Sequence, residues 1–228
     1  MLIAIDIYNE INTLSKKDGR EGFFSKTDFN TWSPSVEQLL MNYYCDQSKQ
    51  NDEVIESLRP FLKEVSFPIT NGILTIPTDY RRFEDLSFTK VINSETCGEN
   101  PITTTLSADY IDIDEFNDMM RSPIRKPDFS KGKVRYRIIN QNIQISEKVG
   151  TANLIYVRNP VYANLNFTFN SSTEEEEYNS TNTLNFEFLP KDRNKIVDLF
   201  CLKLGLSIRD RDLMSWMQVN SQLEQMGK

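Results

Sequence analysis

The first 62 residues show the helical spacing of apolar side chains. An apolar stripe recurs every three or four residues, at Ile3, Ile7, Ile11 and Leu14. Ser25 and Asp28 then have the spacing of a capping box, and Ser33-Pro34 supplies a second N-cap with a first-turn proline. The helix that follows would bury Val36, Leu39, Leu40, Tyr43 and Tyr44. Residues 52–58 predict a third helix, because Pro60 disfavours helical geometry at the residue before it.

The middle of the chain changes to an alternation of apolar and polar residues. Residues 63–69 and 73–76 flank Asn71-Gly72, which predicts a tight β-hairpin. Residues 79–83 predict a turn of helix and residues 112–120 a further helix. An antiparallel meander with one solvent-facing side is expected from the alternation in residues 134–139, 143–146 and 151–157.

The last third combines a strand-like stretch, a polar stretch and two helices. Residues 162–169 alternate and predict a hairpin, either projecting from the body or at a sheet edge. Residues 170–183 contain four consecutive glutamates and no aliphatic side chain, so we expect an acidic loop. Residues 184–188 predict a strand and residues 191–204 a helix ended by Gly205. A last helix follows from residue 207.

These elements indicate an α+β protein. We expect a helical body formed by the N- and C-terminal helices, a central antiparallel β region, and a projecting hairpin or arm. The chain would divide into a helical part over residues 1–62, a β part over residues 63–190 and a pair of helices over residues 191–228. The β part would include an arm at residues 119–133 and the acidic loop at 170–183. All three would form one compact body rather than independent domains.

Composition narrows the classes of function. The chain has 228 residues, 39% of them hydrophobic, and no histidine, which excludes His-based catalysis and His-ligated metal sites. Cys45, Cys97 and Cys201 form no CxxC motif, so we expect reduced thiols. No apolar run reaches the roughly 18 residues of a membrane span, and the first residues do not resemble a signal peptide. Catalysis by carboxylates or lysine and Mg²⁺ sites remain possible after these exclusions, and we expect no membrane contact.

An acidic group of side chains precedes and opens the helix predicted at residues 112–120. Acids in a first helical turn are favourable because they face the positive end of the helix dipole. The alternative is a Mg²⁺ site in an enzyme that acts on phosphate esters through Asp109, Asp112 and Asp114. The group consists of Asp109, Asp112, Asp114, Glu115 and Asp118.

The charge then reverses. Residues 119–137 contain seven basic side chains against one acid, although the whole chain has a net charge of −7. Such a segment could contact a phosphate backbone, pair with an acidic patch of a neighbouring subunit, or remain solvated. Its prolines favour an extended arm. The candidate contact residues here are Arg121, Arg125, Lys126, Lys131 and Lys133.

Four apolar residues are further candidates for contacts with other subunits or with a DNA channel. Phe167 and Phe169 lie in the stretch that predicts the hairpin, beside its polar tip. Trp216 and Met217 lie in the last helix, which either packs on the chain's own body or docks into a partner's groove.

Several short motifs, taken in order, resemble the head-to-tail connector and ring proteins of tailed bacteriophages. The resemblance is strongest to the neck ring proteins of crAss-like phages, which are related in plan to podovirus tail-tubular adaptors. Two motifs are strand ends, Pro77-Thr78-Asp79-Tyr80 and Tyr156-Val157-Arg158-Asn159-Pro160. The others are the helical stretches at 3–14 and 29–44, Leu58-Arg59-Pro60-Phe61, Ser122-Pro123 and residues 184–190 with the following helix.

The resemblance implies a virion structural protein that is not an enzyme and has no cofactor or metal. Such proteins form a ring, expected to be a dodecamer, below the portal protein in the phage neck. They join the capsid to other neck and tail rings and line the channel through which genomic DNA passes without sequence-specific binding. The chain would be assembled in the host cytoplasm and end in the virion. A nucleic-acid-binding accessory protein and a Mg²⁺-dependent phosphoesterase are the alternatives.

Overall fold

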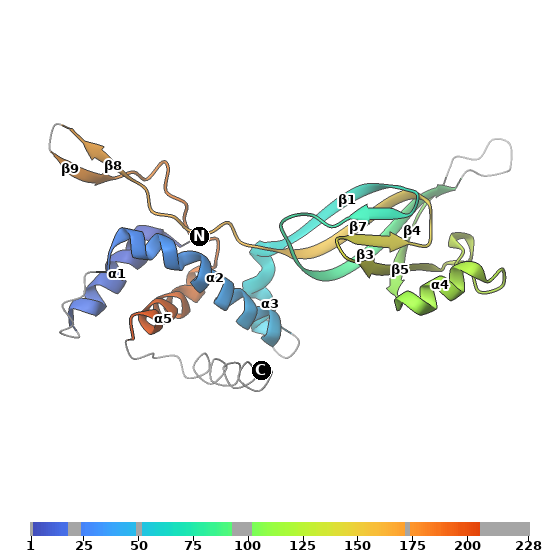
Figure 1. The fold of residues 1–228 in the computed structure, drawn as a ribbon, viewed down its shortest axis with the longest axis horizontal. Coiled ribbons are helices and arrows are strands. Elements are labelled where there is room, and N and C mark those ends of the chain that lie inside the picture. Colours follow the sequence, from blue (N-terminus) through green and yellow to red (C-terminus); the bar gives the residue numbers. More distant parts are fainter. Residues whose placement is uncertain (1, 18–23, 49–51, 93–101, 172–173, 206–228) are drawn as a thin grey trace. The chain divides into compact units, whose positions relative to one another are not determined.

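The structure, a computed structural model, describes residues 2–17, 24–48, 52–92, 102–171 and 174–205. Contacts divide the chain into two compact units (Figure 1). Met1–Pro60 and Pro160–Lys228 form one, called here the helical unit, and Phe61–Asn159 form the other, the barrel unit. The segments predicted as 1–62 and 191–228 thus fall almost wholly in the helical unit. The expectation that both units form one body stays a prediction.

The helical unit contains α1 (Ala4–Lys17), α2 (Lys26–Gln47), α3 (Asp52–Leu58) and α5 (Arg193–Lys203). The capping box is confirmed, since the Ser25 hydroxyl accepts a hydrogen bond from the Asp28 backbone N–H and Asp28 accepts from the Ser25 N–H. The second helix start at Ser33-Pro34 is wrong, because α2 continues through Pro34. The Ser33 hydroxyl instead donates to the Phe29 carbonyl one turn earlier.

Aromatic side chains fill the core of the helical unit. Phe29 of α2 stacks on Phe200 of α5 with ring centroids 5.1 Å apart, and Phe24 and Phe186 meet these rings edge-on. All four rings are buried. Rings in such arrangements contribute about 0.5–1.5 kcal/mol per pair beyond the burial of their area. The core therefore joins segments from both ends of the chain.

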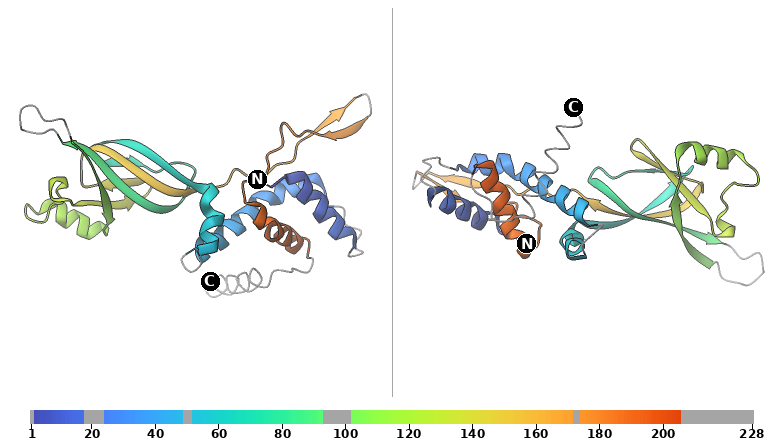
Figure 2. Two further views of the ribbon diagram at one scale, coloured as in Figure 1. Left: turned by 180° about the vertical axis from the view of Figure 1, so that it is seen from behind. Right: turned by 90° about the horizontal axis from the view of Figure 1, so that it is seen from below.

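The barrel unit is built on seven of the described strands, which close in the order β1-β2-β6-β5-β4-β3-β7. Figure 2 shows the barrel from behind and from below. Its core includes Phe88, Leu154 and Tyr156, each with no exposed surface. The strands are β1 (Leu62–Thr70), β2 (Ile73–Thr75), β3 (Tyr80–Ile92), β4 (Ile102–Tyr110), β5 (Val134–Ile139), β6 (Asn142–Ile145) and β7 (Val149–Arg158).

The predicted architecture is therefore wrong in its main feature. The chain does mix helices and strands, but the closed barrel dominates it, in place of a helical body around a central antiparallel region. Residues 79–83 are not a helical turn: β3 begins at Tyr80 and pairs with β7 through two register shifts. Such bulges break the alternation that identifies a strand in the sequence. β4 was not predicted at all.

The meander is also wrong beyond β6. β5 and β6 pair antiparallel as expected, but β7 pairs with β1 and β3. β4 and β5 are parallel, because the chain crosses between them through α4 (Ile113–Arg121) and a short 3-10 helix, Phe129–Lys131. The barrel thus closes through strands far apart in the sequence. The hairpin turn at Asn71 and Gly72, both with positive φ, is confirmed.

A separate two-stranded hairpin belongs to the helical unit. It pairs β8 (Phe167–Asn170) with β9 (Glu175–Tyr178), and Figure 1 shows it extending away from the unit's helices. The predicted loop at 170–183 is wrong over Glu175–Tyr178, where the glutamates form a strand paired with β8. The strand predicted at 184–188 is reduced to isolated bridges at Leu184 and Phe186.

Candidate interaction surfaces

The basic segment after α4 is held against the barrel rather than extended as an arm. After α4 ends at Arg121, the chain turns and enters the 3-10 helix at Phe129. The Phe129 ring is buried in the barrel core and meets Phe88 edge-on at 5.7 Å. Asp128 caps the 3-10 helix by accepting from the Ser130 N–H. The arm prediction is wrong because one aromatic side chain anchors the segment.

Arg137 attaches α4 to the barrel. Its buried guanidinium donates to Gln144 Oε1 from two nitrogens, at 2.9 and 2.6 Å. It also donates to the Ile113 carbonyl at 3.1 Å and to Asn117 Oδ1 at 2.8 Å, both on α4. Phe116 packs beneath the guanidinium, 4.7 Å from the ring centroid. Arg137 therefore anchors α4, although the sequence placed it among the seven basic side chains of residues 119–137.

Arg135 also has a structural role, because it forms an ion pair with Asp109 on the neighbouring strand β4. The remaining basic side chains, Arg121, Arg125, Lys126, Lys131 and Lys133, are exposed. Lys131 lies 3.9 Å from Asp128. Among the described residues, the other four form no ion pair. The structure thus separates two structural arginines from five surface cations.

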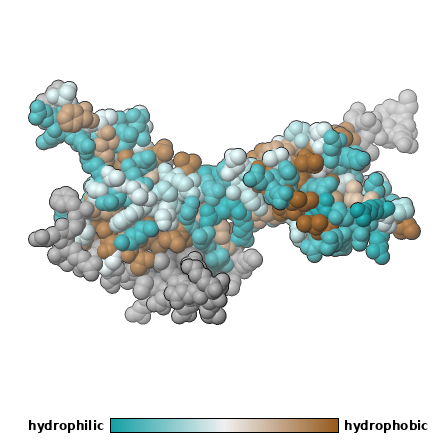
Figure 3. All heavy atoms as spheres, in the orientation of Figure 1, coloured by the Kyte–Doolittle hydropathy of each residue, from teal (hydrophilic) through white to brown (hydrophobic). Residues whose placement is uncertain are grey.

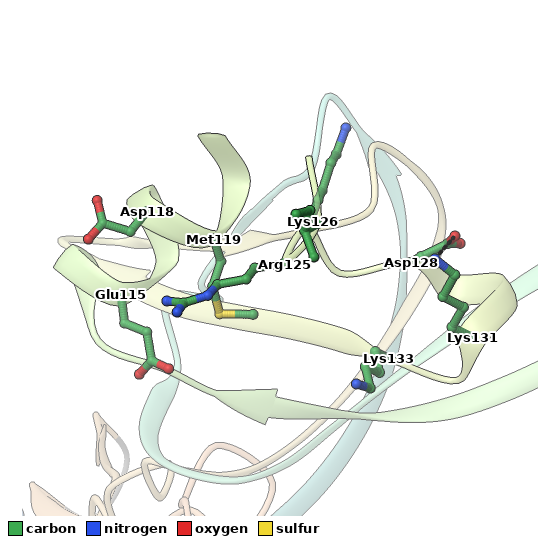
Figure 4. A pocket seen from close by; sticks show the side chains of 9 residues that line it. Glu115, Asp118, Met119, Arg125, Lys126, Asp128, Lys131 and Lys133 are labelled. Carbon is green, nitrogen blue, oxygen red and sulfur yellow. Dashed lines mark ion pairs between the residues drawn. The ribbon is translucent and has the colours of Figure 1, made fainter. Parts of the chain in front are cut away.

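Four of these cations line an open groove of about 710 Å³. Its opposite wall is acidic, with Glu115 and Asp118 on α4. Figure 4 shows Arg125 extending towards this wall across Met119, whereas Lys126 points away from it. Lys133 lies at the groove's other side. The groove, called here the basic groove, therefore has mixed charge, with cations in excess by one.

An exposed apolar side chain stands beside these cations. Ile124, a groove residue between Arg121 and Arg125 in the sequence, is 93% exposed. Exposure of one large aliphatic side chain is ordinary, but here it lies within a group of like charges. Together they offer an acidic partner both opposite charge and apolar area.

The β8–β9 hairpin has the opposite charge. Phe167, Phe169, Glu176 and Tyr178 share one face, because Phe167 pairs with Tyr178 and Phe169 with Glu176. Lys26 of α2 lies 3.6 Å from the Phe167 ring centroid and forms an ion pair with Glu176. These contacts hold the hairpin to α2 on the face that Phe167 and Glu176 share. Phe169, nearer the tip, is 66% exposed.

The two phenylalanines therefore have different roles. Phe167 is half-buried and meets Tyr178 edge-on at 5.7 Å, so it stabilises the hairpin. Phe169 remains available to a partner, and Figure 3 shows an apolar patch within the hydrophilic surface of this hairpin. Trp216 and Met217, the other two candidate contacts, lie outside the described residues.

The two strand-end motifs meet at one end of the barrel. Tyr80 pairs with Arg158, and the Asn159 side chain donates to the Tyr80 carbonyl. Asp79 accepts hydrogen bonds from Lys63 Nζ and from the Tyr156 hydroxyl, both at 2.8 Å. The hydrogen bond from Lys63 holds the pKa of Asp79 below its usual value, against a smaller opposing effect of burial. Two motifs nearly 80 positions apart in the sequence are thus in direct contact.

A buried carboxyl group that sequence reasoning missed lies in the helical unit. Glu37 of α2 has no exposed surface, and its Oε1 accepts from the Ala163 N–H at 2.7 Å. Its Oε2 has no hydrogen-bond partner among the described residues. Burial raises the pKa of Glu37 to about 8, opposed by the hydrogen bond from Ala163 and assisted by the nearby Glu187. Only the position of Glu37 beside Val36, on the apolar side of a helix, hinted at this.

The acidic group around α4 has a structural explanation. Asp112 is the N-cap residue of α4, and Asp114 and Glu115 lie in its first turn, as predicted from the helix dipole. Within the described part of the chain, no group of three or more His, Cys, Asp or Glu side chains is arranged to hold a metal ion. None of the described helices is long and apolar enough to cross a membrane.

Comparisons with known proteins leave the chain without an assigned family. No model of a protein family matches the sequence, and no curated protein matches it either.

Proposed function

We propose that this chain is a structural subunit of the head-to-tail connector of a tailed bacteriophage. In this role it forms a ring below the portal protein, contacts other neck and tail rings, and lines the channel through which DNA leaves. The proposal gives the protein no catalytic step, cofactor or sequence-specific contact with DNA. Its place is the virion neck, after assembly in the host cytoplasm.

The observation that carries the proposal is that each unit presents an exposed apolar side chain on a small charged element. Phe169 lies on the acidic hairpin of the helical unit, and Ile124 lies beside the basic groove of the barrel unit. Elements of this kind suit a protein that binds neighbours through several separate surfaces, as a subunit in a ring must. The meeting of the two strand-end motifs adds support, because these motifs carry the resemblance to connector proteins.

A nucleic-acid-binding accessory protein is the second candidate. The exposed cations Arg121, Arg125, Lys126 and Lys133 favour it, since each could neutralise a phosphate. The acidic wall of Glu115 and Asp118 opposes it by repelling a phosphate backbone at the same groove. Gel retardation of duplex DNA at low salt tests this candidate: a complex whose affinity falls steeply with added salt would favour it over the connector.

The connector proposal is tested by measuring oligomeric state. Mass photometry and negative-stain electron microscopy of the purified chain, alone and mixed with the portal protein from the same genome, should show closed rings or ring-on-portal assemblies. A chain that stays monomeric up to concentrations near 100 µM, and that does not bind the portal, would overturn the proposal.

A further inference from the structure

We infer that the β8–β9 hairpin of one copy docks on the basic groove of the next copy. This inference rests on the proposed ring function and names the subunit contact that builds the ring. Its two surfaces lie on different units of the same chain, the hairpin on the helical unit and the groove on the barrel unit. The groove carries exposed lysines beside the exposed Ile124, and the hairpin carries exposed glutamates on the face opposite Phe169.

On the groove side, Lys126 and Lys133 supply the uncompensated charge. Arg125 extends towards Glu115 and Asp118, and Lys131 lies near Asp128, so acids of the same groove offset these two cations (Figure 4). Lys126 and Lys133 are exposed and form no ion pair with any described residue. Ile124, 93% exposed, adds the apolar contact.

On the hairpin side, the uncompensated charge belongs to Glu174, Glu175 and Glu177. All three are exposed, and none forms an ion pair within the described part of the chain. Glu176 differs, because it forms an ion pair with Lys26 of α2. Glu175 and Glu177 share one face of β9, and Phe169 protrudes from the opposite face, 66% exposed.

The two surfaces are complementary in charge. Lys126 and Lys133 oppose Glu175 and Glu177, which favours encounter in the correct orientation, and Ile124 adds apolar area that the docked hairpin removes from water. A copy of the chain is the occupant that these observations favour, since the complementary surface is present on the same chain. Because hairpin and groove are different patches, the contact is head-to-tail, and head-to-tail contacts close into rings when the rotation between copies allows.

Charge reversal on each surface tests the contact. The groove variant carries Lys126→Glu and Lys133→Glu, and the hairpin variant carries Glu175→Lys and Glu177→Lys. All four side chains are exposed, so we expect both variants to fold, which their thermal midpoints check. Each should lose self-association by more than about tenfold in affinity, because like charges then face each other. The matched control, Lys16→Glu with Lys148→Glu, reverses two exposed lysines elsewhere and should associate as the wild type does.

Restoration makes the test specific. A chain carrying all four substitutions has opposite charges facing again and should recover association. A mixture of the groove variant with the hairpin variant should associate although neither does alone, since each supplies the surface that the other lacks. The mixture also separates contact between copies from docking of the hairpin on its own chain, which mixing cannot restore.

The remaining outcomes overturn the inference in distinguishable ways. If the two variants form rings like the wild type, the contact is elsewhere, and the connector proposal stands. If the variants fail to associate and neither the mixture nor the quadruple variant recovers, the hairpin and the groove do not face each other, and each contacts another part of the neighbouring copy. If the wild type itself never associates, alone or with the portal protein, the proposed function fails and this contact with it.

Discussion

At the scale of single residues, Glu37 of the helical unit is a carboxyl group in an environment that disfavours its charge. A buried carboxyl group whose Oε2 has no hydrogen-bond partner among the described residues costs several kcal/mol when ionised, so folding favours the protonated form. Its one bonded oxygen accepts from Ala163 in the segment that follows Asn159, the last residue of the barrel unit. The ionisation of Glu37 therefore bears on how firmly this segment is bound to α2.

Glu37 should make the stability of the protein fall as the pH rises. The pKa in the folded state, about 8, lies above the usual 4.5, so the unfolded chain loses this proton first. The contribution is fully present below about pH 4.5 and is lost as the pH rises towards 8, at up to about 1.4 kcal/mol per pH unit. Glu37→Gln keeps a neutral side chain at all pH values. We expect the unfolding free energy of this variant, relative to wild type, to rise between pH 5 and pH 8.

Urea unfolding at several pH values measures this difference. The control is Glu64→Gln, at an exposed position of β1, which should follow the wild-type profile. Parallel pH profiles for wild type and Glu37→Gln would show that Glu37 is ionised in the folded protein.

At the scale of elements, α4 is a short helix stabilised mainly by one side chain of the barrel. Nine residues form too few hydrogen bonds to be stable alone in water. Burial of Phe116 and two hydrogen bonds from Arg137 to α4 supply the attachment, and two further bonds hold Arg137 to Gln144 on β6. The acidic wall of the basic groove depends on this attachment, because Glu115 and Asp118 lie on α4.

Arg137→Met should detach α4 while leaving the strands paired. The methionine fills part of the volume but leaves the acceptors of Ile113, Asn117 and Gln144 without this donor, at a cost of roughly 2–4 kcal/mol. Arg137→Lys should recover only part of this, because an ammonium group lacks the planar fork of donors. Hydrogen exchange of the α4 amides, together with urea unfolding, measures both effects. Arg121→Met on the same helix is the control, with an expected change within about 0.5 kcal/mol, and an equal loss in both variants would contradict the anchor role.

The elements that the sequence predicted are those whose signals are local. The capping box at Ser25 and Asp28, the Asn71-Gly72 turn and the helix dipole at Asp112 each depend on residues within one or two turns. The barrel escaped prediction because its closure depends on pairing between distant strands, such as β1 with β7. The glutamates of β9 read as a loop because their strand geometry comes from pairing with Phe167–Asn170 and from Lys26, not from intrinsic β propensity.

The candidate surface was also predicted only where its signal is local. Five of the seven basic residues in 119–137 are exposed, and their charge can be read directly from the sequence. Arg135 and Arg137 differ because their partners, Asp109 and the acceptors on α4 and β6, are brought near by the parallel pairing of β4 with β5. Nothing in the spacing of residues 119–137 indicates that pairing.

At the scale of the whole molecule, each unit has a core of its own. The core of the barrel unit lies entirely within Phe61–Asn159, and the aromatic core of the helical unit joins residues from both sides of that segment. The chain crosses between the units only at Pro60 and at Pro160. A unit inserted in this way can unfold separately from its host, provided that few contacts couple them.

Two substitutions that each create a cavity, one in each unit, test whether the units unfold as one body. Leu154→Ala empties space in the barrel core and Ile11→Ala in the helical core, both at side chains with no exposed surface, and each should cost about 2–5 kcal/mol. For independent units, calorimetry should show two transitions, with Leu154→Ala lowering only one midpoint and Ile11→Ala only the other, by roughly 10–20 °C. One transition lowered by both substitutions would instead support the single body expected from the sequence.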